Sequence, residues 1–203
     1  MSKRPHITEM TRKNLIDSFW KIYQTKSIER ISVREITDMA GYNRGTFYLY
    51  FRDIYDVLDS VESDVINMMN AEIERYRAIF KSTGFEPTVE EITSAAIDIC
   101  QKCEFKPLIL LSDRGDSGFE RKLRETMYKD LSEKVDGITG IDECTKEYTV
   151  SFFISGVIGV LKKWYNEGMV IPVEQHLAAV CNVLFGKKVF NRNSESSATG
   201  KEG

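Results

Sequence analysis

The chain has 203 residues, 42% of them hydrophobic, which suffices for one large domain or for a small domain joined to a larger one. No segment approaches the roughly 20 consecutive apolar residues that span a membrane, and no apolar signal core follows the first residues, so we expect a cytoplasmic protein. The net charge of −3 is unevenly distributed: residues 1–52 carry +5 and the remaining residues carry −8. A basic N-terminal quarter on an acidic remainder is typical of a nucleic-acid-binding unit joined to a body that avoids phosphate.

Cysteine and histidine usage argues against a disulfide scaffold, a metal site and an enzyme. The four cysteines are too few and too scattered for a disulfide framework. Cys100 and Cys103 form one C-x-x-C, but it lies on an apolar helical segment without a second such pair or a paired histidine, which favours a structural role. His6 and His176 lie far apart, and no Gly-rich phosphate loop or nucleophile elbow occurs. We therefore expect a non-enzymatic protein without metal or cofactor.

Apolar residues recur at intervals of three and four without strand-like alternation, which predicts an all-α chain of about nine helices. The first four helices are expected over 8–23, 32–40, 43–51 and 53–80. Their predicted N-caps are Thr8, Ser32, Asn43 and Asp53, and Glu35 completes a capping box with Ser32. Later helices are expected over 88–103, 105–111, 117–135, 142–166 and 173–186.

The stretch 32–51 holds two short helices separated by Gly41 and Tyr42, a spacing typical of a helix-turn-helix. At about 100° per residue, Phe47 and Phe51 face inward together, while Gly45, Thr46 and Leu49 lie on the opposite side. A packed three-helix unit with incidental basic residues would show the same spacing, so the pattern alone leaves both interpretations open.

Each residue on the outward side has a use on DNA. Arg44 can donate two hydrogen bonds to guanine, Thr46 and Leu49 can contact a thymine methyl, and Gly45 permits close backbone approach. Phosphate contacts are expected from the hydroxyls of Tyr48 and Tyr50 and from Arg34 on the preceding helix.

The run from Ser32 to Phe51, SVREITDMAGYNRGTFYLYF, resembles the signature of TetR-family regulators, in which AGVSxGTFYxYF is typical. The match covers about a quarter of the chain. It implies an all-α regulator with an N-terminal three-helix helix-turn-helix DNA-binding domain and a C-terminal helical ligand-binding and dimerisation domain. Such a protein would bind double-stranded operator DNA, as a repressor that a small-molecule effector releases. The implied DNA-binding residues are Ser32, Arg34, Asn43, Arg44, Gly45, Thr46, Tyr48, Leu49, Tyr50 and Arg52.

The resemblance also sets the expected domains: residues 1–52 as the DNA-binding domain, 53–190 as the effector-binding and dimerisation domain, and 191–203 as a disordered tail. Three positions depart from the family pattern. Ile54 stands where the family places a lysine that grips phosphate, and Arg52 is the nearest candidate to compensate. Ser27 replaces a usual glycine and Phe19 a usual alanine. The missing lysine keeps an alternative open, a co-activator or protein-partner-binding regulator with weak or no direct DNA binding.

Two features predict the role of the body. The segment 142–166 is apolar on more than one face and 173–186 offers a second apolar stripe, so we expect a twofold homodimer through both. The resemblance implies a small-molecule site in the body, although methionines and aromatics at helical spacing are more often core. The candidate lining residues are Met68, Met69, Tyr76, Ile97, Cys100, Phe105, Phe119, Tyr128 and Phe152.

Overall fold

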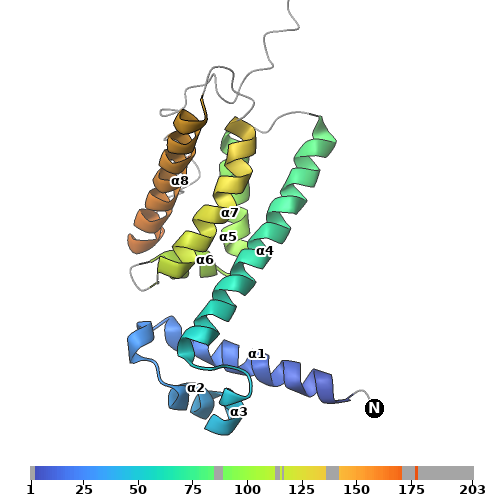
Figure 1. The fold of residues 1–203 in the computed structure, drawn as a ribbon, viewed down its shortest axis with the longest axis vertical. Helices are drawn as coiled ribbons and strands as arrows, with labels where there is room; N and C mark the ends of the chain where they lie inside the picture. The colour runs from blue at the N-terminus through green and yellow to red at the C-terminus, as the bar shows by residue number, and fades with distance from the viewer. Residues whose placement is uncertain are drawn as a thin grey trace, which may run out of the picture.

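The computed structural model describes residues 3–84, 89–112, 115, 117–135, 142–170 and 177, and over these residues the chain is helical without a strand. The elements are α1 (Lys3–Tyr23), the 3-10 helix η1 (Ile28–Arg30), α2 (Val33–Ala40), α3 (Arg44–Tyr48), α4 (Ile54–Thr83), α5 (Val89–Lys102), α6 (Lys106–Leu111), α7 (Ser117–Val135) and α8 (Glu143–Asn166). Helices α1–α3 gather at one end of the molecule, here termed the head, and α4–α8 form the body (Figure 1). The predicted all-α fold is confirmed.

Helix boundaries agree with the sequence-based expectations to within one residue for α5, α6, α7 and α8. Three expectations were wrong. Thr8 is not an N-cap, because α1 begins at Lys3 and accommodates Pro5 in its first turn, where a missing N–H costs little. Helix α3 ends at Tyr48 rather than near residue 51, and α4 runs on to Thr83 rather than ending near residue 80. The expected helix 173–186 lies outside the described residues except Leu177, and so do His176 and the tail 191–203.

The short helices of the head are held by their caps. The Ser32 hydroxyl accepts a hydrogen bond from the Glu35 amide at 3.3 Å, and the Glu35 carboxylate accepts one from the Ser32 amide at 3.1 Å. Asn43 caps α3 through the Thr46 amide at 2.8 Å, and Asp53 caps α4 through the Asp56 amide at 2.9 Å. Helices this short depend on such caps, because the capping side chains accept hydrogen bonds from amides that have no partner within the helix.

One apolar cluster runs from the head into the body along α4. Leu15 and Phe19 of α1 and Phe47 of α3 belong to it, and all three are fully buried. The same cluster contains Val57 of α4 and Phe119 of α7. Helix α4 therefore contributes to the core of both parts. No described helix combines the length and apolarity that crossing a membrane would require.

We predict that Gly41→Ala destabilises the fold by about 1 kcal/mol, because Gly41 ends α2 in the left-handed region at φ +74°. A Cβ there would meet no atom within 4 Å, so the cost comes from backbone conformation alone. Gly41→Asn, which tolerates this conformation better, should cost less. Urea unfolding followed by circular dichroism measures both, and equal losses for the two variants would contradict the conformational explanation.

Candidate functional site

The turn between α2 and α3 fixes which residues of α3 face solvent. Phe47 and Phe51 are buried and lie 5.7 Å apart between ring centroids, as their spacing predicted. The chain leaves the helix after Tyr48, but the Phe51 amide still donates to the Phe47 carbonyl at 3.0 Å. This continued turn brings Phe51 back to the core beside α1, where the Arg12 guanidinium lies over its ring at 5.4 Å.

The opposite side of α3 is open. Leu49 is 81% exposed and Tyr48 is 59% exposed, high values for large apolar side chains. Arg44 and Gly45 are also exposed, while Tyr50 is half-buried against the core. A leucine and a tyrosine held in water beside an arginine lose nothing by contacting another surface, and such a patch marks an interaction site.

The arginines predicted to contact DNA differ in their surroundings. Arg44 forms no ion pair with any described residue, whereas Arg34 pairs with Asp38 and Arg52 with Asp56, each at 3.4 Å. The Asp56 carboxylate also accepts the Arg52 amide at 2.9 Å, and these bonds to Arg52 lower the pKa of Asp56. Both pairs are solvated, so they are weak and can give way to a phosphate.

The other polar residues predicted to contact DNA, Ser32, Asn43 and Thr46, form hydrogen bonds within the helix caps. Thr46 donates from its amide and its hydroxyl to the Asn43 side chain, and the hydroxyl bond measures 3.2 Å. Ser32 caps α2, and Lys26 pairs with the same Glu35 carboxylate that Ser32 contacts. The pKa of Glu35 is lowered mainly by the hydrogen bond with Lys26 and, to a smaller extent, by the hydrogen bonds with Ser32.

Ile54, where the family pattern has lysine, is partly buried and packs against the core of the head. The start of α4 also carries two acidic side chains, Asp53 as the cap and Asp56 in the first turn. Its only nearby cation in the sequence is Arg52, which is 87% exposed and engaged with Asp56. The compensation expected of Arg52 therefore requires it to leave that carboxylate.

In the body, α4, α5, α7 and α8 enclose a cavity of about 240 Å³. Its lining is mainly aliphatic, with thioether, thiol and hydroxyl groups and one guanidinium. The described lining residues are Ile66, Met69, Ile73, Tyr76, Arg77, Ala95, Ala96, Ile99, Cys100, Leu123, Thr126, Met127, Leu131, Val157, Ile158 and Leu161.

The structure brings three of the nine candidate effector residues to this cavity: Met69, Tyr76 and Cys100. The other six lie elsewhere. Ile97 and Phe105 pack in a second cluster with Trp164, Phe119 is fully buried in the main core, and Tyr128 lines a shallow depression between α7 and α8. Met68 faces a groove against α1, and Phe152 is 60% exposed on α8.

A polar network that includes the cavity residue Tyr76 joins α4 to α5. The Tyr76 hydroxyl donates to Asp98 at 2.6 Å, and Lys102 pairs with Asp98 at 2.6 Å and with Glu72 at 3.0 Å. The Asp98 bond is the main reason that the pKa of Tyr76 is raised. Burial raises the pKa of Cys100 to about 12, so its thiol is neutral and unreactive at ordinary pH.

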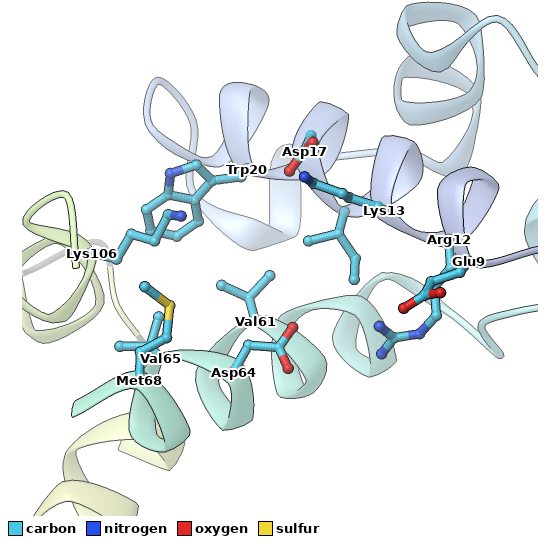
Figure 2. Close-up of a pocket in the computed structure, with 11 residues that line it drawn as sticks. Glu9, Arg12, Lys13, Asp17, Trp20, Val61, Asp64, Val65, Met68 and Lys106 are labelled. Atoms are coloured by element: carbon cyan, nitrogen blue, oxygen red, sulfur yellow. The ribbon is translucent and has the colours of Figure 1, made fainter. Parts of the chain in front are cut away.

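A second hollow, about 330 Å³, lies where the head meets the body, between α1, α4 and the start of α6 (Figure 2). Lys106 of α6 reaches over the Trp20 ring of α1, with Nζ 5.9 Å from the ring centroid. The turn that carries Lys106 holds two non-glycine residues in the left-handed region, Glu104 at φ +55° and Phe105 at φ +56°. Few residues separate this turn from Cys100 in the cavity, so the two sites are joined by a short stretch of chain.

Sequence reasoning missed most of the cavity because its lining is aliphatic and such residues look like ordinary core. One signal was present: Ile66, Met69, Ile73 and Tyr76 recur at intervals of three and four along α4, although Ile66 and Met69 also pack against the main core. Sequence reasoning also missed the contact between Trp20 and Lys106, which no sequence pattern predicts.

Two protein-family models match the chain. Residues 15–61 match the model described as bacterial regulatory proteins, tetR family, and residues 88–186 match a model of a transcriptional regulator C-terminal region, TetR_C_8. No curated protein matches the chain.

Solved structures share the fold at low sequence identity. The fatty acid degradation regulator FadR from Bacillus halodurans is 16% identical, with a TM-score of 0.62 over 87% of this chain and 95% of that one. A tetR-family transcriptional regulator from Streptomyces coelicolor is 18% identical, with a TM-score of 0.56 over 91% and 88%. The dihydroxyacetone kinase operon activator DhaS is 16% identical, with a TM-score of 0.57 over 89% and 97%. With matches to both a tetR-family N-terminal model and a TetR C-terminal model, the chain belongs to the TetR family of transcriptional regulators.

Proposed function

We propose that this regulator is a homodimeric repressor that binds a pseudo-palindromic operator through α3 and leaves it when a small molecule occupies the body cavity. The observation that carries the DNA-binding part is the division of residues 44–51, in which Phe47 and Phe51 are buried and Arg44, Tyr48 and Leu49 face solvent. Residues 1–52 act as the DNA-binding domain and 53–190 as the effector and dimer domain, in the cytoplasm, where operator DNA is available.

Release by an effector is supported by the connection between cavity and head. Helix α4 lines the cavity with its middle and packs on α1 with its first turns, so a shift of α4 is transmitted to the head of the same chain. A ligand that binds better to one spacing of the heads changes operator affinity by its differential affinity for that spacing.

A second candidate, a co-activator or protein-partner-binding regulator, is favoured by one observation. The start of α4 is acidic and apolar where a phosphate-gripping cation is expected, through Asp53, Asp56 and Ile54. The DNA-binding proposal takes precedence because the exposed Tyr48 and Leu49 lie at the end of α3, the helix whose Arg44 no described carboxylate neutralises.

A shift assay with the protein's own upstream DNA tests the choice between the two candidates. We expect binding whose log K falls linearly with log salt, since each arginine or lysine contacting phosphate releases counterions. Random DNA of equal length is the control. Failure to shift the upstream DNA even at low salt would reject direct DNA binding and favour the partner-binding role.

Substitution on α3 tests base reading. Arg44→Ala should weaken operator binding and relax one base preference by roughly 1 to 3 kcal/mol, whereas Tyr48→Phe, which removes a phosphate contact, should weaken binding evenly across sequences. Arg121→Ala, which removes an exposed positive charge from α7 in the body, serves as control. Fluorescence anisotropy against operator and random DNA measures each, and an equal loss on both for Arg44→Ala would refute its base-reading role.

The homodimer is supported by the two faces of α8. Its buried face carries Val150, Ile154 and Ile158, while an exposed stripe follows Tyr148, Phe152, Ser155 and Gly159. The side chains of Tyr148 and Phe152 are 73% and 60% exposed, and a Cβ built on Gly159 meets nothing within 4 Å. A helix with large aromatic and small residues on its outer face is suited to close packing against a second copy.

We predict a solution mass of twice the 23.3 kDa chain and its reduction to one chain by Phe152→Arg, because the new charge would be buried at the interface. The control is Lys163→Ala, further along the same helix at an exposed, charged position. Sedimentation velocity gives the masses. A dimer that survives Phe152→Arg would place the interface elsewhere.

A further inference from the structure

The body cavity is small, mainly apolar and extends along α4. From Ile66 to Arg77 its α4 wall covers eleven residue steps, about 16 Å at the helical rise of 1.5 Å per residue. Its volume of about 240 Å³ lies below the roughly 300–1,000 Å³ typical of sites for drug-sized ligands. A long wall with a small volume favours a slim chain over a bulky ring system.

Charge in the cavity is confined to one end. Among the described lining residues Arg77 alone is charged, and none is a carboxylate. Arg77 lies on the part of α4 remote from the head, while Ile66 marks the end nearer the head (Figure 1). Apart from Arg77 the lining is apolar except for the hydroxyls of Tyr76 and Thr126 and the Cys100 thiol, an environment that excludes a charged group.

Arg77 is placed to receive a headgroup. It is 44% exposed and pairs with Glu74, itself 66% exposed, at 2.5 Å. A pair this solvated is weak, so a ligand carboxylate can compete with Glu74 for the guanidinium. The guanidinium fork matches a carboxylate with two parallel hydrogen bonds, which an ammonium or an alcohol cannot provide.

We propose that the body cavity binds an unbranched aliphatic carboxylate, with its carboxylate on Arg77 and its chain directed along α4 toward Ile66. This inference rests on the proposed function only in naming the ligand an effector. The chain contributes apolar burial and fills the head-proximal end of the cavity, and the single guanidinium sets the preferred charge.

Three probes with ten carbons in the main chain test the charge preference: decanoate, decanol and decyltrimethylammonium, each titrated into the full-length protein below its micelle concentration. Isothermal titration calorimetry should show decanoate binding about threefold to tenfold more tightly than decanol. The cation should bind at least about tenfold more weakly than decanol. Equal binding of cation and anion, or no binding of any probe, overturns the proposal.

Two variants locate the site. Arg77→Met should reduce decanoate affinity to that of decanol and leave decanol unchanged, while Arg121→Met, an exposed charge on α7 outside the cavity, should change neither. Ala96→Trp should block all three probes by filling the cavity, with exposed Ser94→Trp on the same helix as control. If Ala96→Trp does not fold, as judged by circular dichroism, Arg77→Met alone decides. An unchanged ratio of decanoate to decanol affinity in Arg77→Met refutes the assignment.

These titrations contain no DNA, so they separate the ligand proposal from the proposed function. The expected order of probes together with an absence of operator binding would leave the ligand assignment standing and remove the repressor. Operator binding with no preference among the probes would do the reverse.

Discussion

The structure depends on the burial of the first turns of α4 between the head and the body. Val57, Val61 and Val65 belong to one apolar cluster with α1 on one side and with α6 and α7 on the other. Buried side chains of this size contribute roughly 1.5–3 kcal/mol each, and here the contribution is shared by both parts. The head therefore has no separate core, and its orientation follows α4. Buried Glu62, paired with Lys122 of α7 at 2.9 Å, fixes the position of α4 on the body side.

Much of the fold could be predicted from sequence because local chemistry determines it. The capping residues Ser32, Asn43 and Asp53 and the spacing of apolar residues placed most helix ends within one residue. The errors arose where local rules are permissive. Pro5 can occupy the first turn of a helix as readily as precede one, so α1 was predicted too short. Helix α3 ends at Tyr48 although the inward position of Phe51 was predicted correctly, because the apolar spacing gives the face of a residue and not the end of its helix.

The two candidate sites, the α3 surface and the body cavity, differ in how well the sequence predicts them. The α3 surface follows from helical rotation alone: once Phe47 is inward, the exposure of Tyr48 and Leu49 is determined, and the burial values agree. The cavity cannot be predicted in this way, because it is a space left between four helices that come together only when the protein folds. Aromatic and methionine residues were natural candidates by size, yet Phe119 fills the core and Phe152 faces away, while small Ala95 and Ala96 help to leave the space open.

The turn between α5 and α6 stores conformational strain at the junction of cavity and head. Left-handed backbone at Glu104 and Phe105 costs about 1–3 kcal/mol per residue, a cost that the surrounding packing must offset. Lys106 follows these two residues directly, so its position over the Trp20 ring depends on their left-handed backbone. The contact between α6 and α1 therefore rests on a backbone conformation that most residues adopt only at a cost.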